Sequence, residues 1–231
     1  MSFGDIMRST IFLFILLILT FVTFNCHITN AKYFPTQTTN PQYFPNKVFV
    51  DFDHDQVLNE MLIKGYSDYL IALKEPSLFQ ISKESNVQCY RFLWLRSFDE
   101  PMSFRIIISP KSASILIVKM TDENINSAGD FTKNITIKLT KNQVDKFLEK
   151  LIIARFWELS PSEPLDIRYD KHGNEYLVGI MDGSTWVYEG VKNRVYHVVE
   201  RKPESKFCDE SFLDVGLNLI KLSRLNIEKI Y

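Results

Sequence analysis

The stretch Ser184–Arg201, which reads STWVYEGVKNRVYHVVER, indicates how the second half of this chain folds. Two runs rich in β-branched and aromatic residues flank a short polar segment, which is the pattern of a β-hairpin. The hairpin closes through a two-residue turn at Lys192-Asn193 or a four-residue loop at Gly190–Asn193. The first register pairs Tyr188 with His197, and the second pairs Trp186 with the same histidine.

The hairpin gathers aromatic, acidic and basic side chains that suggest an acid–base site. Because side chains alternate between the two faces of a strand, both registers divide them in the same way. The first face carries Trp186, Tyr188, Val195, His197, Val199 and Arg201, and the second carries Val187, Glu189, Tyr196, Val198 and Glu200. His197 therefore cannot meet either glutamate within the hairpin, and a Glu–His pair there is disfavoured.

Further strands are predicted on the N-terminal side of the hairpin. Gln88–Phe98 is apolar on both faces, as expected for a central strand that is covered on two sides. Ser103–Ser109 and Ser114–Thr121 are rich in β-branched residues. Lys133–Leu139 alternates between apolar and polar residues, which indicates a half-exposed antiparallel strand. A last set comprises Tyr176–Met181, Thr185–Glu189 and Arg194–Glu200.

Three segments have the apolar spacing of helices: Asp53–Lys74, a segment from Thr140 to about Trp157, and Ser211–Leu225. The second begins with the capping-box pattern Thr-Lys-Asn-Gln. Strands cluster instead of alternating with helices, so we expect a single α+β domain over residues 51–231. It would hold a largely antiparallel sheet of about six or seven strands, with about three helices mainly on one face. The polar segment Asp166–Glu175 is interpreted as a connector with a Gly-Asn turn, because its glycine does not fit a calcium loop.

The N-terminal 50 residues are expected to lie outside this domain. Residues 1–31 have the layout of a signal peptide, with an apolar run shorter than the ~20 residues that a spanning helix prefers. An uncleaved membrane anchor over residues 10–26 is the alternative. Both interpretations place the domain outside the cytoplasm, most simply in a periplasm. Residues 32–50 contain three prolines and are predicted to form an extended spacer.

Composition and cysteine content limit the choice of partners. The 231-residue chain has a net charge of −1, so it lacks the excess of basic residues that is typical of nucleic-acid-binding proteins. Membrane contact is expected only through the N-terminal segment. Cys89 and Cys208 are the two cysteines that follow the leader. An even number of cysteines in an oxidising compartment predicts a disulfide, and two buried thiols are the alternative.

Four short segments resemble a family of uncharacterised exported bacterial proteins, over about residues 88–222. The resemblance implies export and a single domain, and it implies no activity, cofactor or catalytic residue. The residues that carry it are Tyr90–Phe98, Phe156–Leu159, Asp182–Trp186 with Glu189-Gly190, and Tyr196-His197 with Arg201 and Pro203.

No sequence pattern in the chain matches a known catalytic, zinc or phosphate-binding motif, so no catalytic residue, metal or cofactor is predicted. The favoured hypothesis is a non-enzymatic, extracytoplasmic binding module that presents aromatic and arginine side chains to an unknown protein or envelope component. The alternative is a small hydrolase-like enzyme whose site is assembled around His197 and Arg201. The candidate binding residues are Trp186, Tyr188, His197, Arg201, Arg91 and Arg96.

Overall fold

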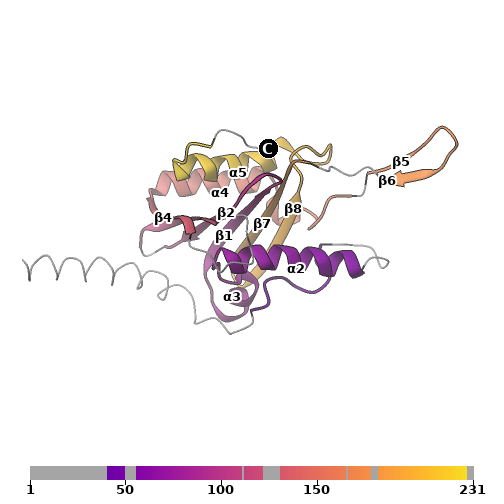
Figure 1. Ribbon diagram of the computed structural model, residues 1–231. Coiled ribbons are helices and arrows are strands. Elements are labelled where there is room, and N and C mark those ends of the chain that lie inside the picture. Colours follow the sequence, from indigo (N-terminus) through magenta and orange to yellow (C-terminus); the bar gives the residue numbers. More distant parts are fainter. Residues whose placement is uncertain are drawn as a thin grey trace, which may run out of the picture. The chain divides into compact units, whose positions relative to one another are not determined.

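A six-stranded antiparallel sheet forms the centre of the domain in the computed structural model, with the strand order β4-β3-β2-β1-β7-β8 (Figure 1). The structure describes residues 41–49, 56–110, 112–121, 131–164, 166–177 and 182–227. The expected signal peptide or anchor lies outside these residues. The strands are β1 (Gln88–Arg96), β2 (Asp99–Ile108), β3 (Ser114–Thr121), β4 (Phe131–Leu139), β7 (Ser184–Lys192) and β8 (Val195–Arg201).

The predicted α+β class is confirmed, and so is the central position of β1. This strand pairs with β2 on one side and with β7 on the other. Its successive residues Phe92, Leu93 and Trp94 are all fully buried, because both faces of the sheet are covered.

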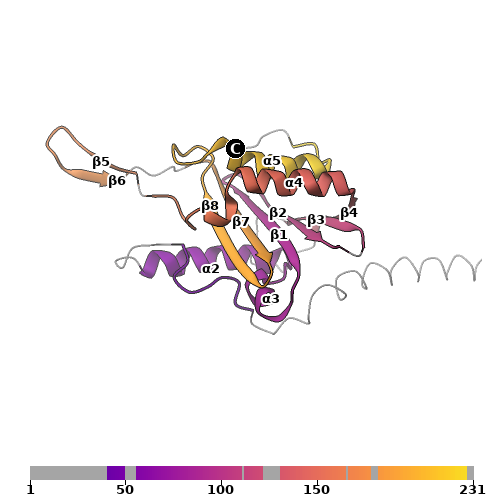
Figure 2. The ribbon, with the colours of Figure 1, turned by 180° about the vertical axis from the view of Figure 1, so that it is seen from behind.

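Helices cover both faces of the sheet, whereas we expected them mainly on one. Helices α4 (Lys141–Ile153) and α5 (Glu210–Ser223) lie on one face, and α2 (Gln56–Ala72) and α3 (Leu78–Glu84) lie on the other (Figures 1 and 2). The short α3 was not predicted, and the Ser77 side chain caps its start. The capping box of α4 is present as expected, with Thr140 as the N-cap.

The β7–β8 hairpin has the predicted faces but a different turn. Asn193 and Arg194 form the turn, with φ of 52° and 65°, and Gly190 is the residue paired with His197. Two consecutive left-handed residues are typical of a tight hairpin turn whose twist matches its strands. The observed register differs from both expected ones by an even number of residues, so every side chain keeps its predicted face.

Two apolar clusters, one on each face of the sheet, form the core. The larger packs under α4 and α5 and contains Phe92, Trp94, Trp186 and Tyr188. The smaller packs against α2 and contains Leu93, Val187 and Val198, together with three aromatic residues that precede α2: Tyr43, Phe44 and Phe49.

Residues 41–49 are thus packed into the domain, unlike the extended spacer that we expected. The segment has no helix or strand, but its polar groups are fixed by hydrogen bonds. The Tyr43 hydroxyl donates to the carbonyl of Glu75 at 2.8 Å, and the main-chain N–H of Phe49 donates to Asn59 Oδ1 at 3.0 Å. Tyr43 and Phe44 of this segment therefore close the small core.

A separate two-stranded hairpin consists of β5 (Ile167–Tyr169), which lies in the segment predicted as a polar connector, and β6 (Glu175–Leu177), which overlaps the start of the predicted strand Tyr176–Met181. Its turn confirms the Gly-Asn interpretation, with Gly173 at φ 82°. The Asp170 carboxylate accepts from the main-chain N–H groups of His172 and Asn174 at 2.7 and 2.9 Å, and so it closes the turn itself.

Two features are absent from the residues that the structure describes. None of the helices in these ranges is long and apolar enough to cross a membrane. The same ranges contain no cluster of three or more His, Cys, Asp or Glu residues that could hold a metal ion.

Candidate functional site

The aromatic residues of the hairpin, predicted as binding residues, are part of the core. Trp186 and Tyr188 are 1% and 3% exposed. The Trp186 indole N–H donates to the hydroxyl of Ser184 at 2.9 Å, and the Tyr188 ring packs edge-on against Phe212 of α5, with 4.5 Å between the ring centroids. Both side chains therefore hold α5 on the sheet and are closed to a partner.

His197 is half-buried on the same face and contacts aromatic rings. The ring centroids of Phe156 and Trp157 lie 5.1 and 5.9 Å from that of the imidazole. Burial lowers the pKa of His197, and the carbonyl groups of Phe156 and Leu159 oppose this shift. In the part of the chain that the structure describes, no carboxylate or hydroxyl group pairs with this imidazole, so nothing there activates it as a general base.

Arg201, the other residue of the hydrolase hypothesis, is buried and occupied by main-chain groups. Its guanidinium donates to the carbonyls of Glu200 and Ser160 at 2.7 and 2.9 Å. It also lies over the ring of Phe212, 5.8 Å from the centroid. Arg201 thus joins the end of β8 to the segment that follows α4.

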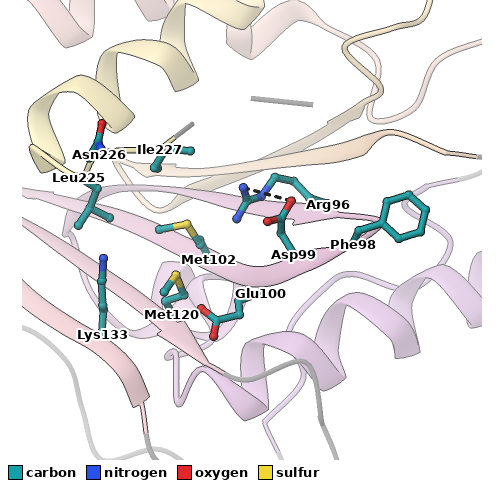
Figure 3. Close-up of a pocket in the computed structure, with 10 residues that line it drawn as sticks. All are labelled: Arg96, Phe98, Asp99, Glu100, Met102, Met120, Lys133, Leu225, Asn226 and Ile227. Carbon is teal, nitrogen blue, oxygen red and sulfur yellow. Dashed lines mark ion pairs between the residues drawn. The ribbon is translucent and has the colours of Figure 1, made fainter. Parts of the chain in front are cut away.

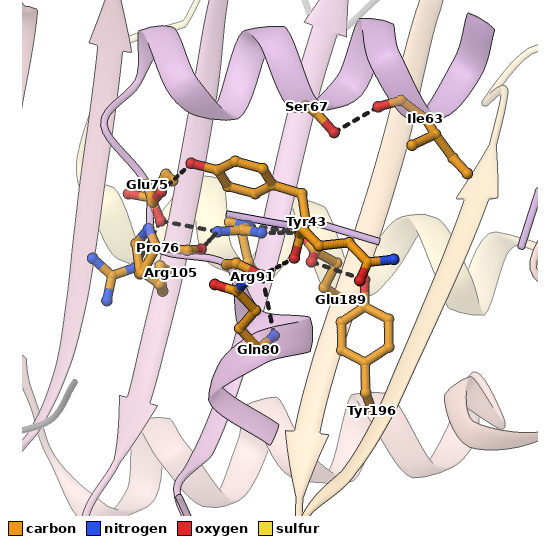
Figure 4. A network of polar contacts seen from close by, with 12 residues as sticks. Tyr43, Ile63, Ser67, Glu75, Pro76, Gln80, Arg91, Arg105, Glu189 and Tyr196 are labelled. Atoms are coloured by element: carbon orange, nitrogen blue, oxygen red, sulfur yellow. Dashed lines mark hydrogen bonds and ion pairs between the residues drawn. The ribbon is translucent and has the colours of Figure 1, made fainter. Parts of the chain in front are cut away.

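Arg91 is fully buried, which contradicts its predicted place on a binding surface. It is the direct cross-strand neighbour of Glu189, and its Nε donates to Glu189 Oε2 at 2.7 Å (Figure 4). Its Nη1 donates to the carbonyl of Pro76 at 2.6 Å and lies 3.4 Å from Glu75 Oε2. An arginine in the middle of an apolar strand is thus paired inside the protein.

A second carboxylate, Glu75, completes what we call the buried charge cluster: Glu75, Arg91, Arg105, Lys119 and Glu189. Glu75 accepts from Arg105 Nε at 2.7 Å, and Lys119 Nζ lies 3.1 Å from its other oxygen. Burial alone would raise the pKa of Glu75, but the three cations together lower it to about 2. Burial raises the pKa of Glu189, although Arg91 opposes that shift.

The side chains of the buried charge cluster are closed to solvent in the described structure, which is typical of a structural role. Each of its side chains is at most 8% exposed. It joins Glu75, in the connection between α2 and α3, to four strands of the sheet: β1, β2, β3 and β7. The sequence signal that could have revealed it is a charged residue inside each of these otherwise apolar strands.

The two cysteines predicted to form a disulfide are free thiols in the structure. Cys89 alternates along β1 with Tyr90, so it lies on the face of the sheet that carries Arg91 and Leu93. Cys208 packs against the apolar cluster on the opposite face. The sheet therefore separates the two sulfur atoms.

An open pocket of about 570 Å³ lies at the end of the sheet where β1 turns into β2 (Figure 3). Four neighbouring strands and the segment that follows α5 contribute to it. Arg96 is the one predicted binding residue among those that line it. The lining residues are Arg96, Phe98, Asp99, Glu100, Met102, Met120, Lys133, Leu225, Asn226 and Ile227.

The charged groups of the pocket differ in how well they are paired. The Arg96 guanidinium lies 3.4 Å from Asp99 and stacks over Trp94, with its Cζ 4.4 Å from the ring centroid. Glu100 accepts a hydrogen bond from the hydroxyl of Thr132 at 3.3 Å. Lys133 is exposed, and within the described ranges it forms no ion pair or hydrogen bond through its side chain.

Sequence reasoning missed most of this pocket. Met102, Met120 and Lys133 lie on three different strands, and only the sheet register places them side by side: Met102 pairs with Met120, and Met120 with Lys133. The pattern of alternation on Lys133–Leu139 predicted which face each side chain takes, but not which neighbours it meets.

Comparison with protein-family models, with curated proteins and with solved structures gave no match. The resemblance to exported bacterial proteins therefore stays a prediction.

Proposed function

We propose that this chain is a non-enzymatic, extracytoplasmic binding protein and that its ligand is a component of the cell envelope held in the pocket at the end of the sheet. The observation that carries the proposal is the pocket itself. Its volume of about 570 Å³ is in the range of small-molecule sites, and it combines apolar walls with a few charged groups.

Extracytoplasmic placement is supported by the N-terminal sequence, in which an apolar run precedes a short polar segment. A binding role is favoured over hydrolysis because His197 and Arg201, the residues of the hydrolase alternative, contact aromatic rings and main-chain carbonyl groups. Two aromatic rings contact His197, and two main-chain carbonyl groups hold Arg201. A hydrolytic mechanism needs a base with an oriented partner, and among the described residues neither His197 nor Arg201 has that arrangement.

The pocket favours a small molecule over a folded protein as the partner. A protein interface needs a broad patch with exposed aromatic or arginine anchors. Of the candidate anchors, Trp186, Tyr188 and Arg91 are buried in the core.

The binding proposal is tested by incubating the purified domain with an envelope extract, removing unbound material and identifying retained small molecules by mass spectrometry. The comparison is with Met120→Trp, which fills the floor of the pocket, and with Asn226→Trp, which obstructs its exposed side. We expect compounds that the native protein retains and both variants lose, with thermal melts showing that each variant is folded. Equal retention by all three proteins would place binding elsewhere.

Placement outside the cytoplasm is tested separately. Residues 1–50 fused to a reporter that is active only after export should give activity, and residues 32–50 alone should give none. Activity of the shorter fusion would show that the apolar run is not the export signal.

A further inference from the structure

We propose that the pocket takes an amphipathic molecule with a single carboxylate, whose head group pairs with Lys133 and whose apolar chain lies along Met102 and Met120. This inference rests on the proposed function, since it names the ligand class of the same pocket.

The floor of the pocket suits an apolar chain. Met102 and Met120 are directly paired across β2 and β3, and Met102 is 1% exposed while Met120 is half-buried. Leu225 and Ile227 supply apolar surface on the side of α5. Methionine side chains are flexible and polarisable, so they adapt to an alkyl chain without a fixed shape.

The charges favour a carboxylate head group at Lys133. Figure 3 shows the two methionine sulfurs between Lys133 and Arg96, so a chain lying on them would end near one of these cations. Arg96 is already neutralised by Asp99 and held against Trp94. Lys133 is the cation that gains a partner when an anion binds.

Glu100 sets the limit on ligand charge. It lines the same pocket, and its partner is the neutral hydroxyl of Thr132. The four charged groups Arg96, Lys133, Asp99 and Glu100 therefore sum to zero. A ligand with one negative charge gains Lys133, whereas a second negative charge would meet the uncompensated carboxylate.

The test uses three probes with the same eight-carbon chain and different head groups: octanoate, octan-1-ol and octylammonium. Binding is followed through the methyl signals of ¹³C-labelled methionine, with Met102→Leu and Met120→Leu to assign them. The variants are Lys133→Met and Lys133→Gln. The matched control is Lys138→Met, because Lys138 is also exposed on β4 but does not line the pocket.

We expect octanoate to shift both methionine signals and to bind about fivefold more tightly than octan-1-ol, since an exposed ion pair adds only a modest preference. Octylammonium should bind less tightly than octanoate, because Glu100 already accepts a hydrogen bond from Thr132 whereas the Lys133 ammonium has no partner among the described groups. Both Lys133 variants should bind octanoate and octan-1-ol equally, whereas Lys138→Met should keep the preference. Raising the salt concentration should reduce the preference of the native protein.

Two results separate failure of this inference from failure of the proposed function. If octan-1-ol or octylammonium shifts the methionine signals as strongly as octanoate, or if the preference survives in both Lys133 variants, the carboxylate assignment is wrong but the pocket still binds ligands. If no probe shifts either signal, the pocket is not a site for amphipathic ligands, and both proposals fall.

Discussion

Replacing Gly216 by alanine should destabilise this protein, although the same change stabilises most helices. Gly216 lies in the middle of α5, where the helix meets the hairpin. A Cβ atom at this position would overlap the hydroxyl of Tyr188 and would lie 2.7 Å from Cζ3 of Trp186. Both neighbours are buried rings that have no free space into which to move.

The expected magnitude follows from two opposing terms. Alanine is favoured over glycine in a helix interior by about 1 kcal/mol. Overpacking a filled core costs about 1–3 kcal/mol, and contacts under 3 Å to two aromatic side chains belong at the upper end. The free energy of unfolding of Gly216→Ala should therefore fall by about 1–2 kcal/mol, as measured by urea denaturation.

Gly65 offers the matched control, because it lies inside α2 and a Cβ atom there would have nothing within 4 Å. Gly65→Ala should raise the free energy of unfolding by about 0.5–1 kcal/mol. Adding Tyr188→Phe to Gly216→Ala removes the overlapping hydroxyl, so the double variant should lose less than the sum of the single changes. If Gly216→Ala stabilises the protein as Gly65→Ala does, the described packing of α5 on Tyr188 is incorrect.

Three further predictions concern the buried groups. Arg91→Met should lower the free energy of unfolding by about 3–5 kcal/mol, because it leaves Glu189 buried without its partner. The control Arg168→Met breaks an exposed pair with Asp166 and should cost no more than about 1 kcal/mol in the same denaturation assay. Equal losses in the two variants would contradict the buried charge cluster. Burial, followed by the nearby Glu163, raises the pKa of Glu200 to about 7, so the folded state favours the neutral carboxyl and stability should fall as pH rises from about 4.5 to 7. Glu200→Gln should remove about 3 kcal/mol of this loss when the free energy of unfolding is compared at pH 4.5 and pH 8, and an unchanged pH profile would contradict the assignment. Cys89 is buried, and burial raises the pKa of its thiol to about 12, so a thiol reagent should leave it unmodified in the native protein. After denaturation without reductant, the same reagent should modify two thiols of the domain. If no free thiol is found under those conditions, Cys89 and Cys208 are bonded and the structure is wrong on this point.

In the β7–β8 hairpin, strand alternation predicts the faces of the side chains but not the position of the turn. The faces of Trp186, Tyr188 and His197 follow from the period of two residues, and they are as predicted even though the turn lies elsewhere. The turn itself depends on Asn193 and Arg194 adopting left-handed conformations. Asparagine tolerates that region well, but an arginine there gives no sequence signal.

For the candidate binding residues, the sequence did not predict whether each side chain is exposed or buried. Aromatic and arginine side chains are typical both of interfaces and of well-packed cores, and their identity does not distinguish the two. Arg91 is buried because Glu189 is directly across the sheet and Glu75 is brought to it by the loop between α2 and α3. Helices cover both faces of the sheet because β1 is apolar on both sides and must be covered on both.

Three features follow from local sequence patterns: the α+β class, the face of each hairpin side chain and the capped start of α4. Periodicity and capping depend on residues close together in the chain. The packing of residues 41–49, the separation of Cys89 from Cys208 and the buried charge cluster depend instead on the three-dimensional fold. So does the pocket, in which Met102, Met120 and Lys133 meet. These features bring together residues that are distant in sequence. The strand order and register determine which residues meet, and local sequence patterns do not predict either.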